Sequence, residues 1–461
     1  MKRCLQARFA LAVLLSFVAA SSQWLWADHS EPSSAEVAAI TWQAESSHLA
    51  LSARDSDFYL RIRVKAAAVE TQRQPLNLAL VFDRSGSMKE DAKIGYLRQA
   101  GHLVVDNLAR QDRLAIVAYN HQVQTLVPLH SVVNREYLHH RIDELFPDGQ
   151  TNLSAGLLEG CAQLHPRLSE PGLHHVILLT DGLANRGVTD ANSLVRLVER
   201  CTQHAITVST IGVGTEYNET LLSRIAGAGG GRYGYVAKPD EIPAAFEREL
   251  GALLAVVAQN AKLKMDLPAG VEPVQVYGRE EPLQPDKLEV SLGDLASGEE
   301  RVLLVKFRVT SAAASGTVEL PSVLTYDDIE RAERIETQQL VAIERAAAGT
   351  TVAAKQTPVL AYARLVEAAD KIAVTVQSMD RTLAAEVQRI RQQEFPALKQ
   401  IAWDSRDQDF VNKAFLFEHY ARELQDLIDR GALHEHSDER AQLQKEFHYR
   451  RYLMEHHDHQ H

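Results

Sequence analysis

No Lys/Arg-rich block occurs in this sequence of 461 residues, and its formal net charge is −12. Nucleic-acid binding needs a basic surface, so this class of function is excluded. After the first 30 residues no apolar run reaches the length of a membrane span, since the run at 251–259 is too short. Hydrophobic content of 45% is that of a globular protein, and the length predicts two or three domains.

Residues 1–27 are typical of a secretory signal peptide. Lys2, Arg3 and Arg8 precede an apolar stretch at 9–20, which is too short to span a bilayer comfortably. An uncleaved anchor is the alternative. We therefore expect an exported chain, periplasmic or secreted, that has no transmembrane span in its mature form.

Strands and helices alternate across residues 75–250. Near-continuous apolar segments predict strands, and amphipathic segments between them predict helices. This alternation indicates an α/β fold, a doubly wound and mostly parallel sheet with helices on both faces. Such sheets bind ligands at the carboxyl ends of their strands. The expected strands are 76–83, 113–120, 174–181 and 205–214, and two of the expected helices are 93–109 and 191–201.

Cysteine is rare, with three in the chain, and Cys4 lies in the signal before its apolar stretch, where it does not resemble a lipid-anchor cysteine. Cys161 and Cys201 fall in two predicted helices that flank the strand 174–181 on the same face of the sheet. They are therefore expected to be neighbours. A disulfide and two separate buried thiols both fit this placement.

Residues 255–345 return to a period of two and predict a small antiparallel β-sandwich. The segment 57–65 also alternates, with Phe58, Leu60, Ile62 and Val64 on one side. It has no strand partners nearby in sequence. We expect this part of the leader, residues 28–70, to join the sandwich, which makes the α/β domain an insertion between sandwich strands.

Residues 351–461 are predicted to be helical and to end in a His-rich tail. Apolar residues at a 4-3 spacing form two seams, and these seams predict either an antiparallel hairpin within the chain or self-association through the helices. The interrupted tail HHDHQH at 456–461 is either a disordered polar end or a transition-metal site. The seams are Leu365, Ala369, Ile372, Val376, Met379, Leu383 and Ile390, then Phe410, Ala414, Phe417, Ala421, Leu424 and Ile428.

The segment LNLALVFDRSGSMKE at 76–90 places polar residues at the end of an apolar strand. Asp83, Ser85 and Ser87 stand at alternate positions of a short loop, and Gly86 would let the backbone turn closely. Two other segments offer oxygen atoms at the same edge of the sheet, with Thr151 before a helix and Asp181 at a strand end. Carboxylates and hydroxyls suit a hard cation such as Mg²⁺. The alternative is a polar turn that caps the next helix.

This pattern resembles the metal-ion-dependent adhesion site (MIDAS) of von Willebrand factor type A (VWA) domains. Asp83-x-Ser85-x-Ser87, then Thr151, then Asp181 agree with that motif in order and spacing. Segments after the motif also look like the bacterial branch similar to inter-alpha-trypsin inhibitor heavy chains, in which a β-sandwich follows the VWA domain.

The resemblance implies a binding protein that is not an enzyme. Ser85, Ser87 and Thr151 would contact Mg²⁺ through their hydroxyls, with Mn²⁺ or Ca²⁺ as alternatives. Asp83 and Asp181 would act directly or through water. One open coordination position would take an Asp or Glu side chain of a partner protein.

Other motifs give no support to catalysis. The serines lack an identifiable base and a G-x-S-x-G elbow, and the glycine-rich segment 227–234 lacks the Lys-Ser/Thr of a nucleotide loop, so it is interpreted as a turn. A second functional hypothesis uses the His-rich tail, in a metal-handling or complex-assembly accessory protein. Truncation of the tail separates the two hypotheses.

Overall fold

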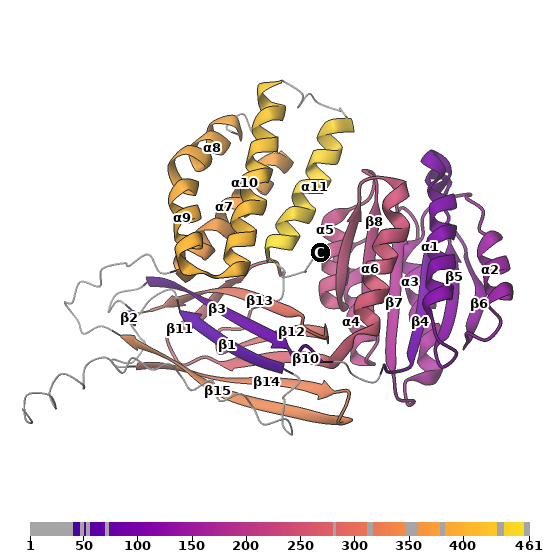
Figure 1. Cartoon of the computed structure of the whole chain (residues 1–461), viewed down its shortest axis with the longest axis horizontal. Coiled ribbons are helices and arrows are strands. Elements are labelled where there is room, and N and C mark those ends of the chain that lie inside the picture. Colours follow the sequence, from indigo (N-terminus) through magenta and orange to yellow (C-terminus); the bar gives the residue numbers. More distant parts are fainter. Residues whose placement is uncertain are drawn as a thin grey trace, which may run out of the picture. The chain divides into compact units, whose positions relative to one another are not determined.

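The computed structural model describes residues 40–46, 50–51, 56–69, 73–279, 283–310, 317–345, 358–378, 383–430 and 438–455 (Figure 1). The predicted signal peptide, the His-rich tail and Met379 of the first helical seam lie outside these residues. Within the described ranges, no helix combines the length and the apolar character that crossing a lipid bilayer requires.

Six strands form the sheet of the α/β part, in the order β6-β5-β4-β7-β8-β9. The four predicted strands are present and parallel to one another, whereas β6 forms an antiparallel hairpin with β5 at the edge. The predicted mostly parallel, doubly wound sheet is therefore confirmed. The strands are β4 (Leu76–Asp83), β5 (Arg113–Tyr119), β6 (Val123–Ser131), β7 (Leu173–Thr180), β8 (Thr207–Val213) and β9 (Gly230–Val236).

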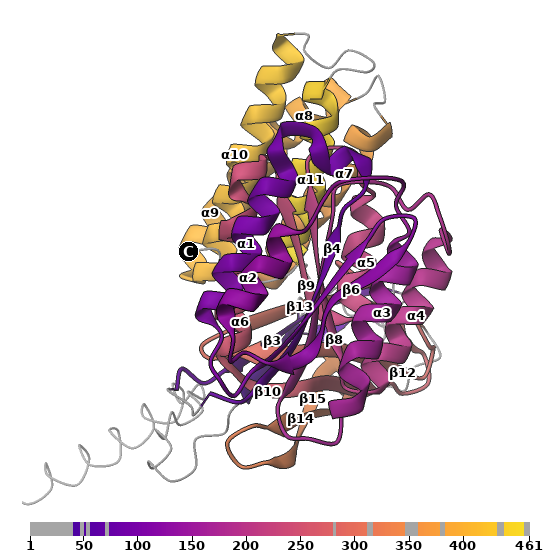
Figure 2. The ribbon, with the colours of Figure 1, turned by 90° about the vertical axis from the view of Figure 1, so that its right-hand side faces the viewer.

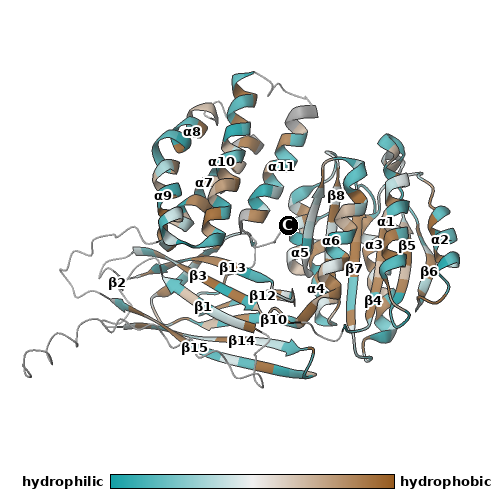
Figure 3. Cartoon of the chain, in the orientation of Figure 1, coloured by the Kyte–Doolittle hydropathy of each residue, from teal (hydrophilic) through white to brown (hydrophobic). Residues whose placement is uncertain are grey.

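Helices cover both faces of this sheet because the side chains of each strand alternate between them. In β4, Leu80 and Phe82 belong to one apolar core, whereas Ala79 and Val81 belong to the other. Figure 2 shows the two helical layers on either side of the strands, and Figure 3 shows the apolar β4 and β7 between them. The first layer is α1 (Lys93–Asn107), α2 (Arg135–Asp143) and α6 (Ile242–Leu254), and the second is α3 (Leu153–Leu164), α4 (Ala191–Gln203) and α5 (Glu219–Ala228).

The glycine-rich segment 227–234, interpreted from sequence as a turn, is mainly strand. α5 ends at Ala228, and β9 begins at Gly230 and pairs in parallel with β8. A β-carbon placed on Gly231 would overlap the carbonyl group of Val208 on the neighbouring strand. Glycine is therefore needed here so that two backbones can approach closely. In the sequence, glycines needed for this reason look the same as glycines of a turn.

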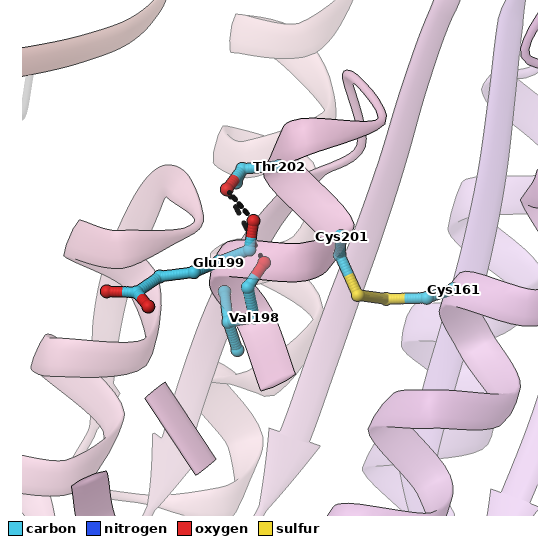
Figure 4. The surroundings of a disulfide bond; sticks show 5 residues. All are labelled: Cys161, Val198, Glu199, Cys201 and Thr202. Atoms are coloured by element: carbon cyan, nitrogen blue, oxygen red, sulfur yellow. Dashed lines mark hydrogen bonds between the residues drawn. A yellow bond between two sulfur atoms is a disulfide. The ribbon is translucent and has the colours of Figure 1, made fainter. Parts of the chain in front are cut away.

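Cys161 on α3 and Cys201 on α4 form a disulfide, with their Cα atoms 6.3 Å apart (Figure 4). Both side chains are buried in the core of the second helical layer. Of the two alternatives left by the sequence, the structure has the bonded pair. The bond joins two neighbouring helices at a sequence separation of 40 residues.

Two sheets pack face to face as the predicted β-sandwich, and their strands are antiparallel except for the short β2, which pairs in parallel with β15. In the first, β3, the alternating segment near residue 60, lies between β1 and β13. Phe58 of β3 stacks on Phe307 of β13, with ring centroids 5.2 Å apart, inside the shared core. One sheet is β1 (Ile40–Ser46), β3 (Ser56–Ala66), β13 (Glu300–Val309) and β11 (Val271–Val276); the other is β12 (Lys287–Ala296), β10 (Val256–Asp266), β14 (Thr317–Asp328), β15 (Glu333–Arg345) and β2 (Ala50–Leu51).

The helical part is more broken than the two predicted seams suggested. Ile390 begins a π-helical turn at 390–394, and Pro396 lies in the first turn of α9. Arg406 has a positive φ of 56°, and Asp407 caps the next helix, α10. The described seam side chains from Leu365 to Leu424 are buried in one core within the chain. The helices are α7 (Pro358–Ser378), α8 (Leu383–Arg389), α9 (Phe395–Ser405), α10 (Gln408–Asp429) and α11 (Asp438–Glu455).

The last described helix, α11, packs on the α/β part. Its Lys445 ammonium pairs with the Glu219 carboxylate and donates to the Tyr217 carbonyl oxygen. The Tyr452 hydroxyl accepts the backbone N–H of Tyr233, 3.1 Å away. Tyr452 is buried in the apolar core of the second helical layer. The prediction of a helical region at 351–461 includes α11 but not this contact, because the receiving surface is formed by residues distant in sequence.

His448 on α11 is buried against α5. Its Nε2 lies 3.2 Å from the Ser223 hydroxyl, and its Nδ1 has no hydrogen-bond partner among the residues that the structure describes. Burial lowers the pKa of His448 to about 4, and repulsion by Arg451 and Lys445 acts in the same direction, whereas Glu219 opposes it. Tyr233 of β9 faces the imidazole ring edge-on. The structure therefore contains a neutral imidazole whose protonation is unfavourable.

We expect this histidine to make the fold acid-sensitive. Its folded pKa lies below the ordinary value of 6.5, so the unfolded chain binds more protons as the pH falls from about 6.5 to 4, and stability is lost in that window. The loss between pH 7 and 5 should be about 2 kcal/mol from this group. Urea unfolding of the parent and of His448→Gln, each at pH 7 and pH 5, measures the contribution of this histidine to the loss of stability. An equal pH effect in both proteins would contradict the prediction.

Candidate metal centre

Asp83 ends β4 as a fully buried carboxylate. Its Oδ1 accepts the backbone N–H of Ser85 at 2.8 Å, and its Oδ2 accepts the Thr180 hydroxyl at 2.6 Å. The Tyr119 hydroxyl lies 3.4 Å from the same Oδ2. Donors therefore hold both oxygen atoms, and the carboxylate is fixed at the carboxyl edge of the sheet.

The two serines of the loop after β4 point toward each other. The Ser85 and Ser87 hydroxyl oxygens are 3.1 Å apart, and Ser87 donates to Asp181 Oδ1 at 2.7 Å. The backbone N–H of Gly86 donates to the Gly149 carbonyl oxygen at 3.0 Å. A β-carbon on Gly86 would make an ordinary contact of 3.4 Å with that oxygen, so the expected need for glycine at position 86 is not found. Gly149, whose φ is +78°, is the position where glycine is required.

Thr151 is buried immediately before the cap of α3. Its backbone N–H donates to Asn185 Oδ1 at 2.9 Å, and its carbonyl oxygen accepts the backbone N–H groups of Asn185 and Arg186. These bonds tie the loop before α3 to the loop after β7. The sequence placed Thr151 in a pre-helix loop, and the structure agrees.

Asp181 is the first residue after β7, whereas the sequence predicted it as the last residue of the strand. It is fully buried. A β-carbon on the next residue, Gly182, would lie 3.5 Å from Thr151 Oγ1 and 3.8 Å from Ser87 Oγ. The three loops therefore converge at one edge of the sheet, and the structure brings the five predicted residues together.

The residue that the sequence interpretation missed is Lys93. It begins α1, is buried, and places its ammonium nitrogen 2.8 Å from Asp181 Oδ2. A cation at the first position of a helix is unfavourable, because the N-terminal end of the helix dipole is itself positive. A buried lysine there needs a carboxylate partner, and this mismatch was the signal in the sequence.

The electrostatics of the centre follow from burial. Burial raises the pKa of Asp83 to about 6, and the charge of Asp181 acts in the same direction, whereas hydrogen bonds from Thr180 and Ser85 oppose the rise. Burial also raises the pKa of Tyr119, so its phenol stays a neutral donor. When both carboxylates are ionised, the Lys93 ammonium balances only one of them.

The donor set fits a hard divalent cation. Three hydroxyl oxygens and two carboxylates at the junction of three loops are ligands that Mg²⁺ and Mn²⁺ prefer, directly or through water. The two carboxylates together carry one more charge than Lys93 neutralises, so a cation would find unbalanced negative charge. Sulfur and imidazole ligands, which favour softer metals, are not among the five residues.

Large apolar side chains lie on loops beside the centre. Phe146 is 68% exposed, in the loop whose Asp148 backbone N–H donates to the Arg84 carbonyl oxygen. Leu183, two residues beyond Asp181, is 56% exposed.

Comparisons with known proteins agree with this geometry. The family model of the von Willebrand factor type A domain matches residues 77–248. An uncharacterized protein of Escherichia coli, YfbK, is 30% identical over 263 residues, which are 56% of this chain and 46% of that protein. The uncharacterized Synechocystis protein sll0103 is 31% identical over 280 residues, which are 58% of this chain and 66% of that protein. The matches thus span less than two thirds of either relative.

More distant similarity extends to animal proteins and to a solved structure. Inter-alpha-trypsin inhibitor heavy chain H1 of Mesocricetus auratus is 29% identical over 156 residues, 32% of this chain and 17% of that protein. The crystal structure of the ArnB paralog VWA2 from Sulfolobus acidocaldarius aligns with a TM-score of 0.61 at 15% identity. It covers 91% of this chain and 99% of that one, and at this identity it shows a shared fold.

Proposed function

Because the chain belongs to the von Willebrand factor type A domain proteins, which commonly mediate protein–protein interaction or adhesion, we propose that it is an exported, Mg²⁺-dependent binding module. Asp83, Ser85, Ser87, Thr151 and Asp181 hold the cation, with Mn²⁺ or Ca²⁺ as substitutes. The partner is a protein that presents an Asp or Glu side chain to one open coordination position. The chain catalyses no reaction of its own.

The observation that supports this proposal most strongly is the convergence of three hydroxyl groups and two buried carboxylates from separate loops. Hydroxyl ligands add no negative charge, so a cation held largely by them keeps net positive charge. A carboxylate from outside completes both its coordination and its charge. The serines are bonded to each other and to Asp181, an arrangement that suits ligands better than nucleophiles.

The surroundings suggest what accompanies the acidic residue of the partner. Exposed Phe146 and Leu183 flank the centre, and apolar side chains of a partner would pack on them. In protein interfaces a few strong central contacts are commonly surrounded by side chains that exclude water. A metal-bound carboxylate with apolar contacts around it would have the same arrangement. The partner segment is therefore an acidic residue with apolar neighbours.

Export is supported by the N-terminal signal pattern and by the disulfide. Disulfides persist in oxidising compartments and are rare in the reducing cytosol. The Cys161–Cys201 bond thus suits a periplasmic or secreted protein.

Affinity capture from native extract, with and without a chelator, tests the proposal when the parent is compared with Ser85→Ala. We expect proteins that the parent captures in Mg²⁺ and loses in chelator, and that Ser85→Ala fails to capture. Ser131→Ala is the matched control, since Ser131 is exposed at the end of β6 beside the first residue of β5, at the opposite edge of the sheet.

Identical captured proteins in all samples would refute metal-dependent docking. A chain without residues 456–461 serves as a further arm. If capture needs this tail but not Ser85, the metal-handling hypothesis replaces the adhesion function.

A further inference from the structure

Two helices of the first layer carry the same short pattern, a histidine followed four positions later by an aspartate. On α1 the pair is His102 and Asp106, and on α2 it is His139 and Asp143. Residues four apart lie on the same face of a helix. The two patterns can therefore face each other when the helices pack side by side.

In the structure the two patterns interlock. His102 Nε2 lies 3.0 Å from Asp143 Oδ1, and His139 Nε2 lies 3.0 Å from Asp106 Oδ1. The two Nδ1 atoms point at each other within hydrogen-bonding distance. The ring centroids are 4.5 Å apart, and the ring planes are nearly parallel, with an angle of 16° between them.

The hydrogen bonds fix where the ring protons are. A carboxylate only accepts, so each Nε2 that bonds to an aspartate carries a proton. A neutral imidazole protonated at Nε2 has a lone pair on Nδ1. Two such lone pairs aimed at each other repel unless a positive centre lies between them, either a shared proton or a metal ion.

The charge of the cluster favours the metal ion. Asp106 and Asp143 contribute two negative charges. One shared proton neutralises one of them, whereas a divalent ion neutralises both. Histidine ligands whose second nitrogen donates to a carboxylate are the usual arrangement at zinc sites, since the carboxylate orients the ring and raises its basicity. Both halves of the cluster have this arrangement.

We propose that His102 and His139 form a second metal site, for Zn²⁺ or another late first-row ion, that links α1 to α2. Tetrahedral Zn²⁺ with Zn–N bonds of about 2.0–2.1 Å requires the two Nδ1 atoms to move to about 3.3 Å apart. The histidine side chains are 30% and 25% exposed, so water completes the coordination. Within the described ranges no three His, Cys, Asp or Glu side chains could hold an ion together, which makes this a two-histidine site.

This site is chemically separate from the centre at the edge of the sheet. Imidazole selects zinc, copper or nickel, whereas hydroxyl and carboxylate oxygens select magnesium or manganese. His102 lies nine residues along α1 from Lys93, about 13 Å at 1.5 Å per residue. Zinc binding at the pair therefore stands whether or not the adhesion function is correct.

Calorimetric titration of the full chain with ZnCl₂ in excess MgCl₂ tests the proposal. The parent is compared with His102→Gln, His139→Gln and the control His140→Gln, whose side chain is 77% exposed on the same helix. We expect about one zinc equivalent fewer in the first two variants and none lost in the control. Zinc bound by the tail is common to all four proteins, and circular dichroism verifies their folding.

Anomalous diffraction at the zinc edge gives the position of the ion. A peak between His102 and His139 is expected in the parent. Equal zinc stoichiometry in all four proteins, or a zinc-treated crystal with no peak between the two rings, would show that the pair holds a shared proton only and would overturn the proposal.

Discussion

Replacing Lys93 by methionine is expected to destabilise the metal-free protein by about 3–5 kcal/mol and to tighten Mg²⁺ binding. Lys93 and Asp181 form a buried ion pair, 2.8 Å between the ammonium nitrogen and Oδ2. Removing Lys93 leaves the negative charge of Asp181 unpaired in the interior beside Asp83, and the two carboxylates repel each other. Methionine retains the length and the apolar stem of the side chain, so the change isolates the charge.

The same substitution should favour the metal. In the parent protein, an incoming cation is repelled by the Lys93 ammonium group, which is paired with Asp181, one of the proposed ligands. At the effective dielectric of a partly buried site, repulsion between such charges amounts to a few kcal/mol, so we expect Mg²⁺ affinity to rise by roughly tenfold or more. Lysine at this position therefore acts as an internal cation that stabilises the empty centre.

Thermal unfolding in chelator and in MgCl₂, with calorimetric Mg²⁺ titration, measures both effects. Lys89→Met is the matched control, because Lys89 is exposed in the short 3-10 segment Gly86–Ala92 that precedes α1. The prediction fails if Lys93→Met unfolds at the parent temperature in chelator, or if it binds Mg²⁺ more weakly than the parent. In the predicted case MgCl₂ restores much of the lost stability, since a ligand that binds only the folded state stabilises it.

Loss of the Cys161–Cys201 disulfide is the second large effect. The bond closes a segment of 40 residues, and for such a loop the chain-entropy model gives a stabilisation of about 4 kcal/mol. The double variant Cys161→Ala/Cys201→Ala should unfold roughly 8–16 °C below the oxidised parent, as expected for a domain of this size. Both cysteines are buried in the same core, so small apolar replacements disturb the packing little.

Thermal unfolding of the parent and the double variant, each with and without dithiothreitol, distinguishes the stabilisation by the disulfide from any effect of the substitutions on packing. The reductant should lower the unfolding temperature of the parent and leave the double variant unchanged. If the reductant changed neither protein, or both by the same amount, the bond would not stabilise the fold.

The α/β fold could be predicted because its strongest signals are local. β4 and β7 are buried on both faces and are therefore apolar at successive positions, which predicts a central parallel strand. β6 and β9 lie at the edges of the sheet, and each is partly exposed. Their apolar patterns are therefore weaker, and the glycines of β9 give this strand a composition that is typical of a turn.

The helical part shows what local periodicity omits. The spacing of apolar residues predicted helices and the seams that they bury. The π-helical turn at 390–394 and the left-handed Arg406 divide them into shorter pieces. The packing of α11 on α5 and β9 depends on Lys445 and Tyr452 meeting residues more than 200 positions earlier. Such long-range contacts leave no pattern in either segment alone.

At the metal centre, the five predicted residues share a motif with a fixed spacing, so their meeting could be expected. Lys93 has no place in that motif, and its role depends on the direction in which α1 leaves the loop. Asp91 and Ala92 adopt positive φ values of 50° and 57° just before α1, a turn that positions Lys93 over Asp181. Alanine does not signal such a conformation, and aspartate, although enriched at positive φ, signals it only weakly.

The most direct test is anomalous diffraction from crystals of the protein grown in MnCl₂. We expect a manganese peak about 2.0–2.3 Å from the hydroxyl oxygens of Ser85 and Ser87, beside Thr151 and Asp181, with the Lys93 ammonium moved from Asp181 Oδ2. An unoccupied centre with the Ser87–Asp181 and Lys93–Asp181 bonds intact at saturating Mn²⁺ would contradict a metal-dependent binding site.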